Sequence, residues 1–379
     1  MAPGKPFRVL MTADAIGGIW DYALELSQAL ARSGVSVSLA VMGGGLDERR
    51  RAAALRIPGL TLDEAPFRLE WMPDPDEDLL RAGDWLMELE RRIKPDVVHV
   101  NGYAHAALPF REPVLCVGHS CVLSWWQGVH GDLPPRDWDR YAERVADGLR
   151  IADLVVAPTR IMLDGLDELY GPLTRTRVIR NGRDPAQYRP LPKQPFVLSA
   201  GRMWDKAKNI ETLDSAAPHL DWPVLVAGDA HGPDGSHAQP QHVRCLGLLP
   251  SEELARIYGR ASIFALPARY EPFGLTALEA ALAGCALVLG DIATLRELWD
   301  GVAVFVDPDD GKGLGDALNR LAEDPVHCRD LGTLARRRAH DYTAARMGRG
   351  YRLAYADLLN GFHRNSAHHQ PGLGPAQVD

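Results

Sequence analysis

The chain has 379 residues with 46% hydrophobic and 24% charged positions, the profile of an ordinary soluble globular protein, and this length predicts two domains. Its 42 Lys and Arg against 50 Asp and Glu give a net charge of -8, which argues against a protein that coats nucleic acid. No apolar run approaches the ~20 residues of a membrane-spanning helix, and the five dispersed cysteines form no zinc-binding cluster, so we expect a cytoplasmic protein.

The first half of the chain has the rhythm of a parallel β-α-β unit. Paired glycines, Gly17 and Gly18, follow the first apolar run and precede a helical pattern over 20–32. A strand, a glycine turn and a helix in this order are typical of parallel sheets. Apolar runs that predict strands lie at 7–11, 35–41, 97–100, 114–117 and 154–157.

A second series of strands follows the proline-rich stretch 188–195, which disfavours helix and is a good candidate for a linker. Its apolar runs lie at 196–200, 224–227, 261–266, 286–289 and 302–306. We therefore predict an α/β protein with two doubly wound domains of similar size that face each other across a cleft. Residues 363–379 lack periodicity and are predicted to be a disordered tail.

Ligands of open parallel sheets bind where glycine-rich loops leave the carboxyl ends of strands. At Gly17 and Gly18, the backbone N–H groups could approach an anion at a helix N-terminus. A plain tight turn is the simpler interpretation of this motif alone. The loop is not GxGxxG, so the dinucleotide fingerprint is absent.

The loop GRMWDKAKN (201–209) carries three cations directly after a predicted strand. Arg202, Lys206 and Lys208 would together neutralise a diphosphate, because Arg grips oxygens bidentately and Lys acts as a point charge. The alternative is a solvated charged face.

The segment EPFGLTALE (271–279) is the most specific of the three loops. Gly274 permits close backbone approach, and a helix that begins near Phe273–Leu275 would add its amides to a phosphate site. Glu271 lies before this helix and Glu279 about two turns along it. Ionised carboxylates suit hydroxyl-rich groups such as a sugar and a ribose, because they accept hydrogen bonds and cannot donate them. The alternative places Glu279 on a solvated helix face.

Taken together, these motifs resemble the retaining GT-B glycosyltransferases of family 4. The resemblance rests on EPFGLTALE as the family's E-x7-E element, GRMWDKAKN as its Gly-Arg followed by Lys-Asn, and Asn181-Gly182-Arg183-Asp184 as its Asn-Gly-x-Asp. The glycine loop after the first strand and His119 after a middle strand also match. The matches run in the family's order from about residue 8 to 345.

The resemblance implies a role for each of these residues. Arg202 and Lys208 would hold the donor's diphosphate, with Lys206 as an alternative to Lys208. Glu271 would bind the donor sugar's hydroxyls and Glu279 those of the ribose. The remaining implied contacts are phosphate or sugar at the backbone of Phe273, Gly274 and Leu275, closure over the phosphates by Gly17 and Gly18, and the reacting sugar at His119. The implied catalytic set is His119, Arg202, Lys208 and Glu271.

The same resemblance implies the division of the chain. Residues 1–190 would form the acceptor-side Rossmann-like domain and 191–340 the nucleotide-sugar-binding one. A helix over 341–362 would cross back to the first domain.

The implied reaction moves a sugar from a nucleotide-diphosphate sugar, UDP- or GDP-linked, to an acceptor hydroxyl with retention of configuration. No cofactor and no metal are expected, although Asp307 and Asp309 could hold Mg²⁺, because the Arg/Lys loop already supplies positive charge. The acceptor (a sugar, a lipid-linked sugar or a small molecule) and a peripheral membrane contact stay open. The alternatives are a nucleotide-sugar epimerase of GT-B architecture and a two-domain protein that binds a ligand without chemistry.

Two other features of the sequence stand outside these motifs. Three tryptophans within 122–138 could form an acceptor-facing wall, or anchor a long loop against the core. His99, inside an apolar strand, is expected to be a core histidine with its hydrogen bonds satisfied.

Overall fold

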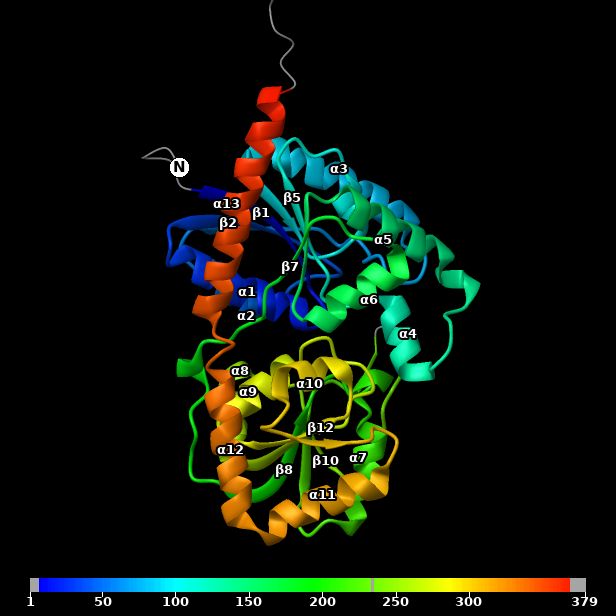
Figure 1. Cartoon of the computed structure of the whole chain (residues 1–379), viewed down its shortest axis with the longest axis vertical. Helices are drawn as coiled ribbons and strands as arrows, with labels where there is room; N and C mark the ends of the chain where they lie inside the picture. The colour runs from blue at the N-terminus through cyan, green and yellow to red at the C-terminus, as the bar shows by residue number, and fades with distance from the viewer. Residues whose placement is uncertain (1–6, 233–234, 369–379) are drawn as a thin grey trace, which may run out of the picture.

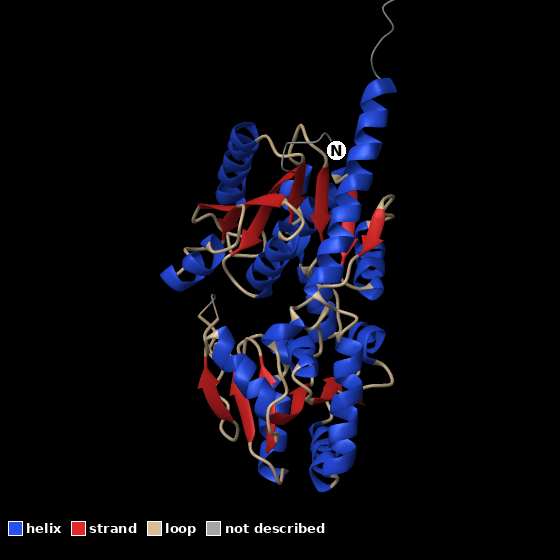
Figure 2. Cartoon of the chain, turned by 90° about the vertical axis from the view of Figure 1, so that its left-hand side faces the viewer, coloured by secondary structure: helices blue, strands red, loops and turns tan. Residues whose placement is uncertain are grey.

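The computed structural model describes residues 7–232 and 235–368, which form two α/β domains stacked along the long axis of the molecule (Figure 1). Each domain contains one sheet, and Figure 2 shows each sheet lying between helices. All the strand pairings within both sheets are parallel. The predicted fold class, two doubly wound domains, is confirmed.

The first domain has a seven-stranded sheet in the order β3-β2-β1-β4-β5-β6-β7. Its strands are β1 (Phe7–Asp14), β2 (Val35–Met42), β3 (Leu60–Glu64), β4 (Val97–Val100), β5 (Val114–Val117), β6 (Leu154–Ala157) and β7 (Thr176–Val178). Its helices are α1 (Gly18–Ala31), α2 (Glu48–Leu55), α3 (Asp76–Ile93), α4 (Val122–His130), α5 (Asp139–Ile151) and α6 (Arg160–Tyr170).

The second domain has a six-stranded sheet in the order β10-β9-β8-β11-β12-β13. Its strands are β8 (Gln194–Ala200), β9 (Val224–Ala227), β10 (Arg244–Gly247), β11 (Ala261–Leu266), β12 (Ala286–Gly290) and β13 (Val304–Val306). Its helices are α7 (Ile210–Ala216), α8 (Ser251–Arg260), α9 (Leu275–Leu282), α10 (Ala293–Trp299), α11 (Gly311–Glu323) and α12 (Pro325–Ala339).

Three strands, β3, β7 and β10, lie outside the apolar runs that predict strands. Each forms an edge of its sheet and is partly exposed. An edge strand has one neighbour and less cover, so it keeps polar residues and leaves no continuous apolar run in the sequence. The predicted strands include all the central ones and one edge strand, β13, whose three residues Val304–Val306 are all apolar.

Both faces of the first sheet are packed. Val9 and Met11 on β1 contribute to a core shared with α1 and with Tyr351 of the last helix. Leu10 points to the other face and packs in a cluster with Leu86 of α3. This alternation is what a strand with helices on both sides requires, and each fully buried side chain of this size contributes about 1.5–3 kcal/mol.

The chain returns to the first domain after α12. Helix α13 (Ala344–His368) begins at the domain boundary and runs along α1 (Figure 1). The return is held by backbone hydrogen bonds, because the Arg183 N–H donates to the Tyr342 carbonyl and the Ala344 N–H donates to the Arg183 carbonyl. Residues 363–368 of the predicted tail belong to α13, and 369–379 lie outside the described residues.

The described helices include none that is both long enough and apolar enough to span a membrane.

Gly182 packs closely against the segment where the chain crosses back to the first domain. A Cβ there would lie 2.4 Å from the carbonyl carbon and oxygen of Thr343, which are backbone atoms that cannot rotate away. We expect Gly182→Ala to lower the free energy of unfolding by about 1–3 kcal/mol through overpacking. The measurement is chemical denaturation followed by circular dichroism.

Gly165→Ala is the matched control. Gly165 lies in α6, and nothing stands within 4 Å of its Cβ position, so alanine there is expected to leave stability unchanged or to raise it by up to about 1 kcal/mol. Equal unfolding midpoints for the two variants would contradict the tight crossing.

Candidate active site

The glycine loop of the first domain lies against the Arg/Lys loop of the second. Gly17 caps α1 with a φ of 80°, a conformation that favours glycine. A Cβ at Gly17 would lie 3.0 Å from Nη1 of Arg202, and one at Gly18 would lie 3.7 Å from Cδ1 of Leu275. Two segments about 185 residues apart in the sequence therefore meet at the N-terminus of α1, where backbone N–H groups favour an anion.

Asp205 organises the Arg/Lys loop. Its carboxylate accepts hydrogen bonds from Nη2 of Arg202 at 2.7 Å and from Nε1 of Trp125 at 3.0 Å. Burial opposes ionisation of Asp205, but Lys208 and Arg202 outweigh it and hold its pKa below the ordinary value. Arg202 is thus fixed by a carboxylate that the first domain also contacts.

Trp125 gives the tryptophan segment a role that is neither an acceptor-facing wall nor an anchor for a long loop. Residues 122–130 form helix α4 instead of a long loop, and Trp125 reaches from α4 to the second domain. Trp126 donates to Asp132, and the ring of Trp138 packs edge-on against Tyr141. One tryptophan therefore contacts the Arg/Lys loop, and the other two make their contacts within the first domain.

Lys208 and Glu271 form a shielded ion pair. The Nζ–Oε2 distance is 2.7 Å, and each side chain is 14% exposed. Burial opposes ionisation of Glu271, but Lys208 lowers its pKa below the ordinary value. Lys206 is exposed on the same 3-10 turn, so Lys208 is the lysine that the fold brings to the predicted site.

The N-terminus of α9 is already in use by Glu271. Its Oε1 accepts hydrogen bonds from the N–H groups of Gly274 at 2.8 Å and Phe273 at 3.3 Å. Leu275 opens the helix beyond the cap residue Gly274, which has a φ of 81°. The loop-then-helix structure predicted for 271–282 is present, with a carboxylate occupying amides that were expected to meet phosphate or sugar.

Glu279 is buried, so the interpretation that places it on a solvated helix face is wrong. Its side chain is 8% exposed, and its Oε1 accepts a hydrogen bond from Nε of Arg183 at 2.7 Å. Burial raises the pKa of Glu279 although Arg183 acts in the opposite direction. Arg183 lies in the Asn-Gly-x-Asp segment, and the sequence pattern gave no reason to single out its side chain.

His119 lies at the end of β5, with Nε2 2.9 Å from Oδ1 of Asn101. The Asn101 amide is oriented by its Nδ2, which donates to the Thr12 carbonyl at 2.7 Å. Its Oδ1 must therefore accept, so Nε2 of His119 carries the proton and Nδ1 is an acceptor. Burial lowers the pKa of His119 to about 3, which keeps the ring neutral.

His99 shares the same acceptor. Its Nε2 lies 3.1 Å from Oδ1 of Asn101, and its Nδ1 lies 2.6 Å from the Tyr355 hydroxyl. The side chain is fully buried. The expectation of a core histidine with its hydrogen bonds satisfied is confirmed.

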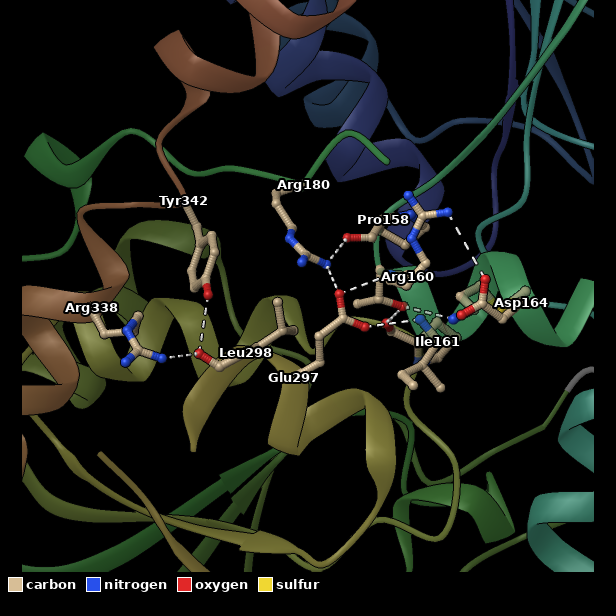
Figure 3. A network of polar contacts seen from close by, with 12 residues as sticks. Pro158, Arg160, Ile161, Asp164, Arg180, Glu297, Leu298, Arg338 and Tyr342 are labelled. Carbon is tan, nitrogen blue, oxygen red and sulfur yellow. Dashed lines mark hydrogen bonds and ion pairs between the residues drawn. The ribbon is translucent and has the colours of Figure 1, made fainter. Parts of the chain in front are cut away.

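A second set of contacts, shown in Figure 3, joins the domains beside the site. The Glu297 carboxylate of α10 accepts from the N–H groups of Arg160 at 2.8 Å and Ile161 at 2.9 Å, which are the first residues of α6. Arg180 adds an ion pair to Glu297 at 2.5 Å. A carboxylate suits this place because the N-terminus of a helix is electropositive.

These contacts extend to the loop of Glu271. Thr159, which caps α6, donates to the Pro272 carbonyl at 3.1 Å. Thr294 of α10 donates to the Glu271 carbonyl at 2.6 Å. The backbone that presents Glu271 is therefore supported from both domains.

Comparison with known proteins places this chain among sugar-transferring enzymes. A model of "Glycosyltransferase Family 4" matches residues 16–187, and one of "Glycosyl transferases group 1" matches residues 194–324. A glycogen synthase of Mycobacterium tuberculosis is 29% identical over 359 residues, covering 85% of this chain and 86% of that protein.

Two solved structures show the same fold. Sucrose-phosphate synthase from Thermosynechococcus elongatus has a TM-score of 0.78 at 20% identity and covers 93% of this chain and 100% of that one. The Anabaena protein HepE in complex with UDP-glucose has a TM-score of 0.72 at 16% identity and covers 93% of this chain and 99% of that one. The two-domain arrangement is the GT-B fold.

The state of His119 can be measured directly. We expect long-range ¹H–¹⁵N NMR to show one neutral tautomer, protonated at Nε2, from pH 5 to pH 8, because burial keeps the pKa near 3. An unperturbed histidine titrates near pH 6.5 in the same range. A cationic His119 signal at pH 5 would contradict the assigned hydrogen bonds, and a His119→Gln sample identifies the resonance.

The lowered pKa of His119 also predicts how the stability of the protein depends on pH. Between about pH 6.5 and pH 3 the unfolded chain binds a proton at His119 that the folded chain does not, so this contribution to stability is lost as the pH falls. We expect His119→Gln to lose less stability than wild type between pH 7 and pH 5, by roughly 2 kcal/mol. The free energy of unfolding is measured by urea denaturation at both pH values. If wild type and His119→Gln lost the same amount of stability between pH 7 and pH 5, His119 would not contribute to the pH dependence.

Proposed function

This chain is a family 4 glycosyltransferase, and we propose that it transfers a hexose from a UDP- or GDP-sugar to an acceptor hydroxyl with retention of the anomeric configuration. One observation carries the proposal. The Lys208–Glu271 pair lies at the N-terminus of α9, and Arg202 of the same loop meets Gly17 at the N-terminus of α1. The N-terminus of α1 and two cations in one place suit a diphosphate.

Charge compensation explains why the loops take this form. In this structure Arg202 is balanced by Asp205, and Lys208 by Glu271. A bound diphosphate would bring its own negative charge to Arg202 and Lys208, which leaves the Glu271 carboxylate to accept hydrogen bonds from sugar hydroxyls. Stabilising the charge that develops on the departing diphosphate is the largest catalytic contribution of such a site.

His119 suits a binding role in this scheme. A neutral ring whose Nε2–H is held by Asn101 presents Nδ1 as an acceptor for a sugar hydroxyl. It is a poor general base for the acceptor hydroxyl, because a ring whose pKa lies far below neutral pH binds a proton only weakly. We therefore assign the acceptor's proton to the leaving phosphate, in a front-face reaction that requires no protein nucleophile.

A metal ion is not needed in this proposal. Arg202 and Lys208 supply the positive charge, and the two carboxylates that suggest Mg²⁺ have other partners. Asp309 pairs with Arg269 at 2.7 Å, and Asp307 accepts a hydrogen bond from the Asp309 N–H. We expect full activity in the presence of a chelator.

The similarity to a glycogen synthase supports a growing polysaccharide as the acceptor, and a structural neighbour solved with UDP-glucose makes UDP-glucose the first donor to test.

The five cysteines are all free thiols. This is the state expected in a reducing compartment, and we propose a cytoplasmic location.

The function is tested with a panel of UDP-, GDP- and ADP-sugars. A bound donor is expected to raise the unfolding temperature, because a ligand at 100 times its Kd stabilises the folded state by about 2.7 kcal/mol. Slow release of the nucleoside diphosphate, with an α-linked product from an α-linked donor by NMR, would support retaining transfer. Binding without turnover, or a changed sugar still attached to its nucleotide, would contradict it.

The two lysines of the loop form a matched pair of variants. We expect Lys208→Ala to lower kcat/KM by about 10²-fold or more, because a charge that stabilises the leaving group is lost. Lys206→Ala should remain within about twofold of wild type, because its side chain is exposed. Equal losses in the two variants, with unchanged circular dichroism, would contradict the assignment of Lys208.

A further inference from the structure

Arg183 is a buried cation held between the two domains. It precedes the linker, and only 7% of its side chain is exposed. Its guanidinium donates from Nε to Glu279 of α9 at 2.7 Å and from Nη1 to the Asp21 carbonyl of α1 at 3.3 Å. Nη1 also lies 3.8 Å from Glu25 of α1. One guanidinium therefore joins the helix that follows Gly17 and Gly18 to the helix that carries Glu279.

The backbone of Arg183 is fixed as firmly as its side chain. Its N–H and carbonyl pair with Tyr342 and Ala344, where the chain crosses back to the first domain. The rigid, planar guanidinium then has few ways to approach Glu279. Its position is determined by the fold and does not depend on a mobile side chain.

Stability alone gives a weak reason for such a cluster. Two carboxylates and one guanidinium are removed from water here, and burial raises the pKa of Glu25 to about 7. Buried ion pairs of this kind are often matched or exceeded in stability by apolar residues of similar volume. A cluster that costs desolvation and lies beside the proposed donor site calls for a functional reason.

The effect of Arg183 on Glu279 supplies that reason. Burial favours the protonated form of Glu279, and Arg183 opposes this. The hydrogen bond from Nε of Arg183 at 2.7 Å also holds the Glu279 carboxylate in one orientation, and a carboxylate held in this way can accept hydrogen bonds from two neighbouring hydroxyls. Glu279 lies five residues beyond Gly274, about 7 Å along the helix, a span that a nucleoside diphosphate covers between its phosphates and its ribose.

We propose that Arg183 is a positioning residue for the nucleoside end of the donor, which holds the Glu279 carboxylate oriented towards the vicinal hydroxyls of the ribose. The inference rests on the proposed function. It adds that the first domain, through Arg183, takes part in recognising the nucleoside that the second domain binds. The occupant is a ribonucleoside diphosphate, and a 2′,3′-dideoxy analogue lacks the groups that this arrangement recognises.

The test compares binding of ribose and dideoxyribose ligands by titration calorimetry. UDP, GDP and ADP, each with its 2′,3′-dideoxy counterpart, are titrated into wild type, Arg183→Gln and Arg183→Lys. In wild type, removal of the hydroxyls should raise Kd at least tenfold. In Arg183→Gln the ribonucleotide should bind about 10- to 100-fold more weakly while the dideoxy analogue changes little. Arg183→Lys keeps the charge without the planar fork and should lie between them.

Arg180→Gln is the matched control. Arg180 lies at the same interface, but its partners are Glu297 and the Pro158 carbonyl. This variant should retain the preference for ribose, and its donor KM should stay close to that of wild type. In Arg183→Gln, the rise in donor KM should exceed the fall in kcat.

The outcomes separate the inference from the function on which it rests. Equal weakening of ribose and dideoxyribose ligands in the Arg183 variants would make Arg183 a structural residue and overturn the inference, with the transferase function intact. A wild type that binds none of the three nucleoside diphosphates would overturn the proposed donor and this inference together. An Arg183→Lys variant that folds with the wild-type unfolding temperature keeps the test valid if Arg183→Gln is unstable.

Discussion

Charged groups paired across the contact between the two domains are the interaction on which the rest of the structure depends. Glu279 is buried against Arg183, and Glu297 is held by the N-terminus of α6. A buried carboxylate without such a partner would be costly. The carboxyl ends of the two sheets face each other across this contact, which brings the glycine loop, the Arg/Lys loop and the loop of Glu271 to one place.

Neither domain holds the complete candidate site by itself. The second domain supplies Arg202, Lys208 and Glu271, but Arg202 is positioned by Asp205, which Trp125 of the first domain contacts. The backbone beside Glu271 is likewise supported by Thr159 of the first domain. A substitution at such a supporting residue acts on the chemistry through geometry alone, because it touches no group that would react.

The sequence predicts the parts of this protein in which residue type and local structure coincide. Apolar runs located the central strands, and Gly274 with the helical run after it located α9. The edge strands β3, β7 and β10 were not predicted, because half-exposed strands carry both polar and apolar residues. The sequence also did not single out three polar residues, Arg183, Asn101 and Glu297, for another reason. Each acts through a partner that is distant in sequence, and a single sequence without its fold gives no sign of that pairing. The difference between Lys206, which is exposed, and Lys208, which pairs with Glu271, likewise depends on the fold of the turn.

The return of the chain along α13 has a mechanical consequence. The polypeptide passes between the domains twice, near residue 184 and near residue 343, and the two passages are joined by hydrogen bonds between Arg183 and its neighbours Tyr342 and Ala344. Neither passage can shift relative to the other without breaking these hydrogen bonds, so the two domains are tethered at one place rather than at two independent ones.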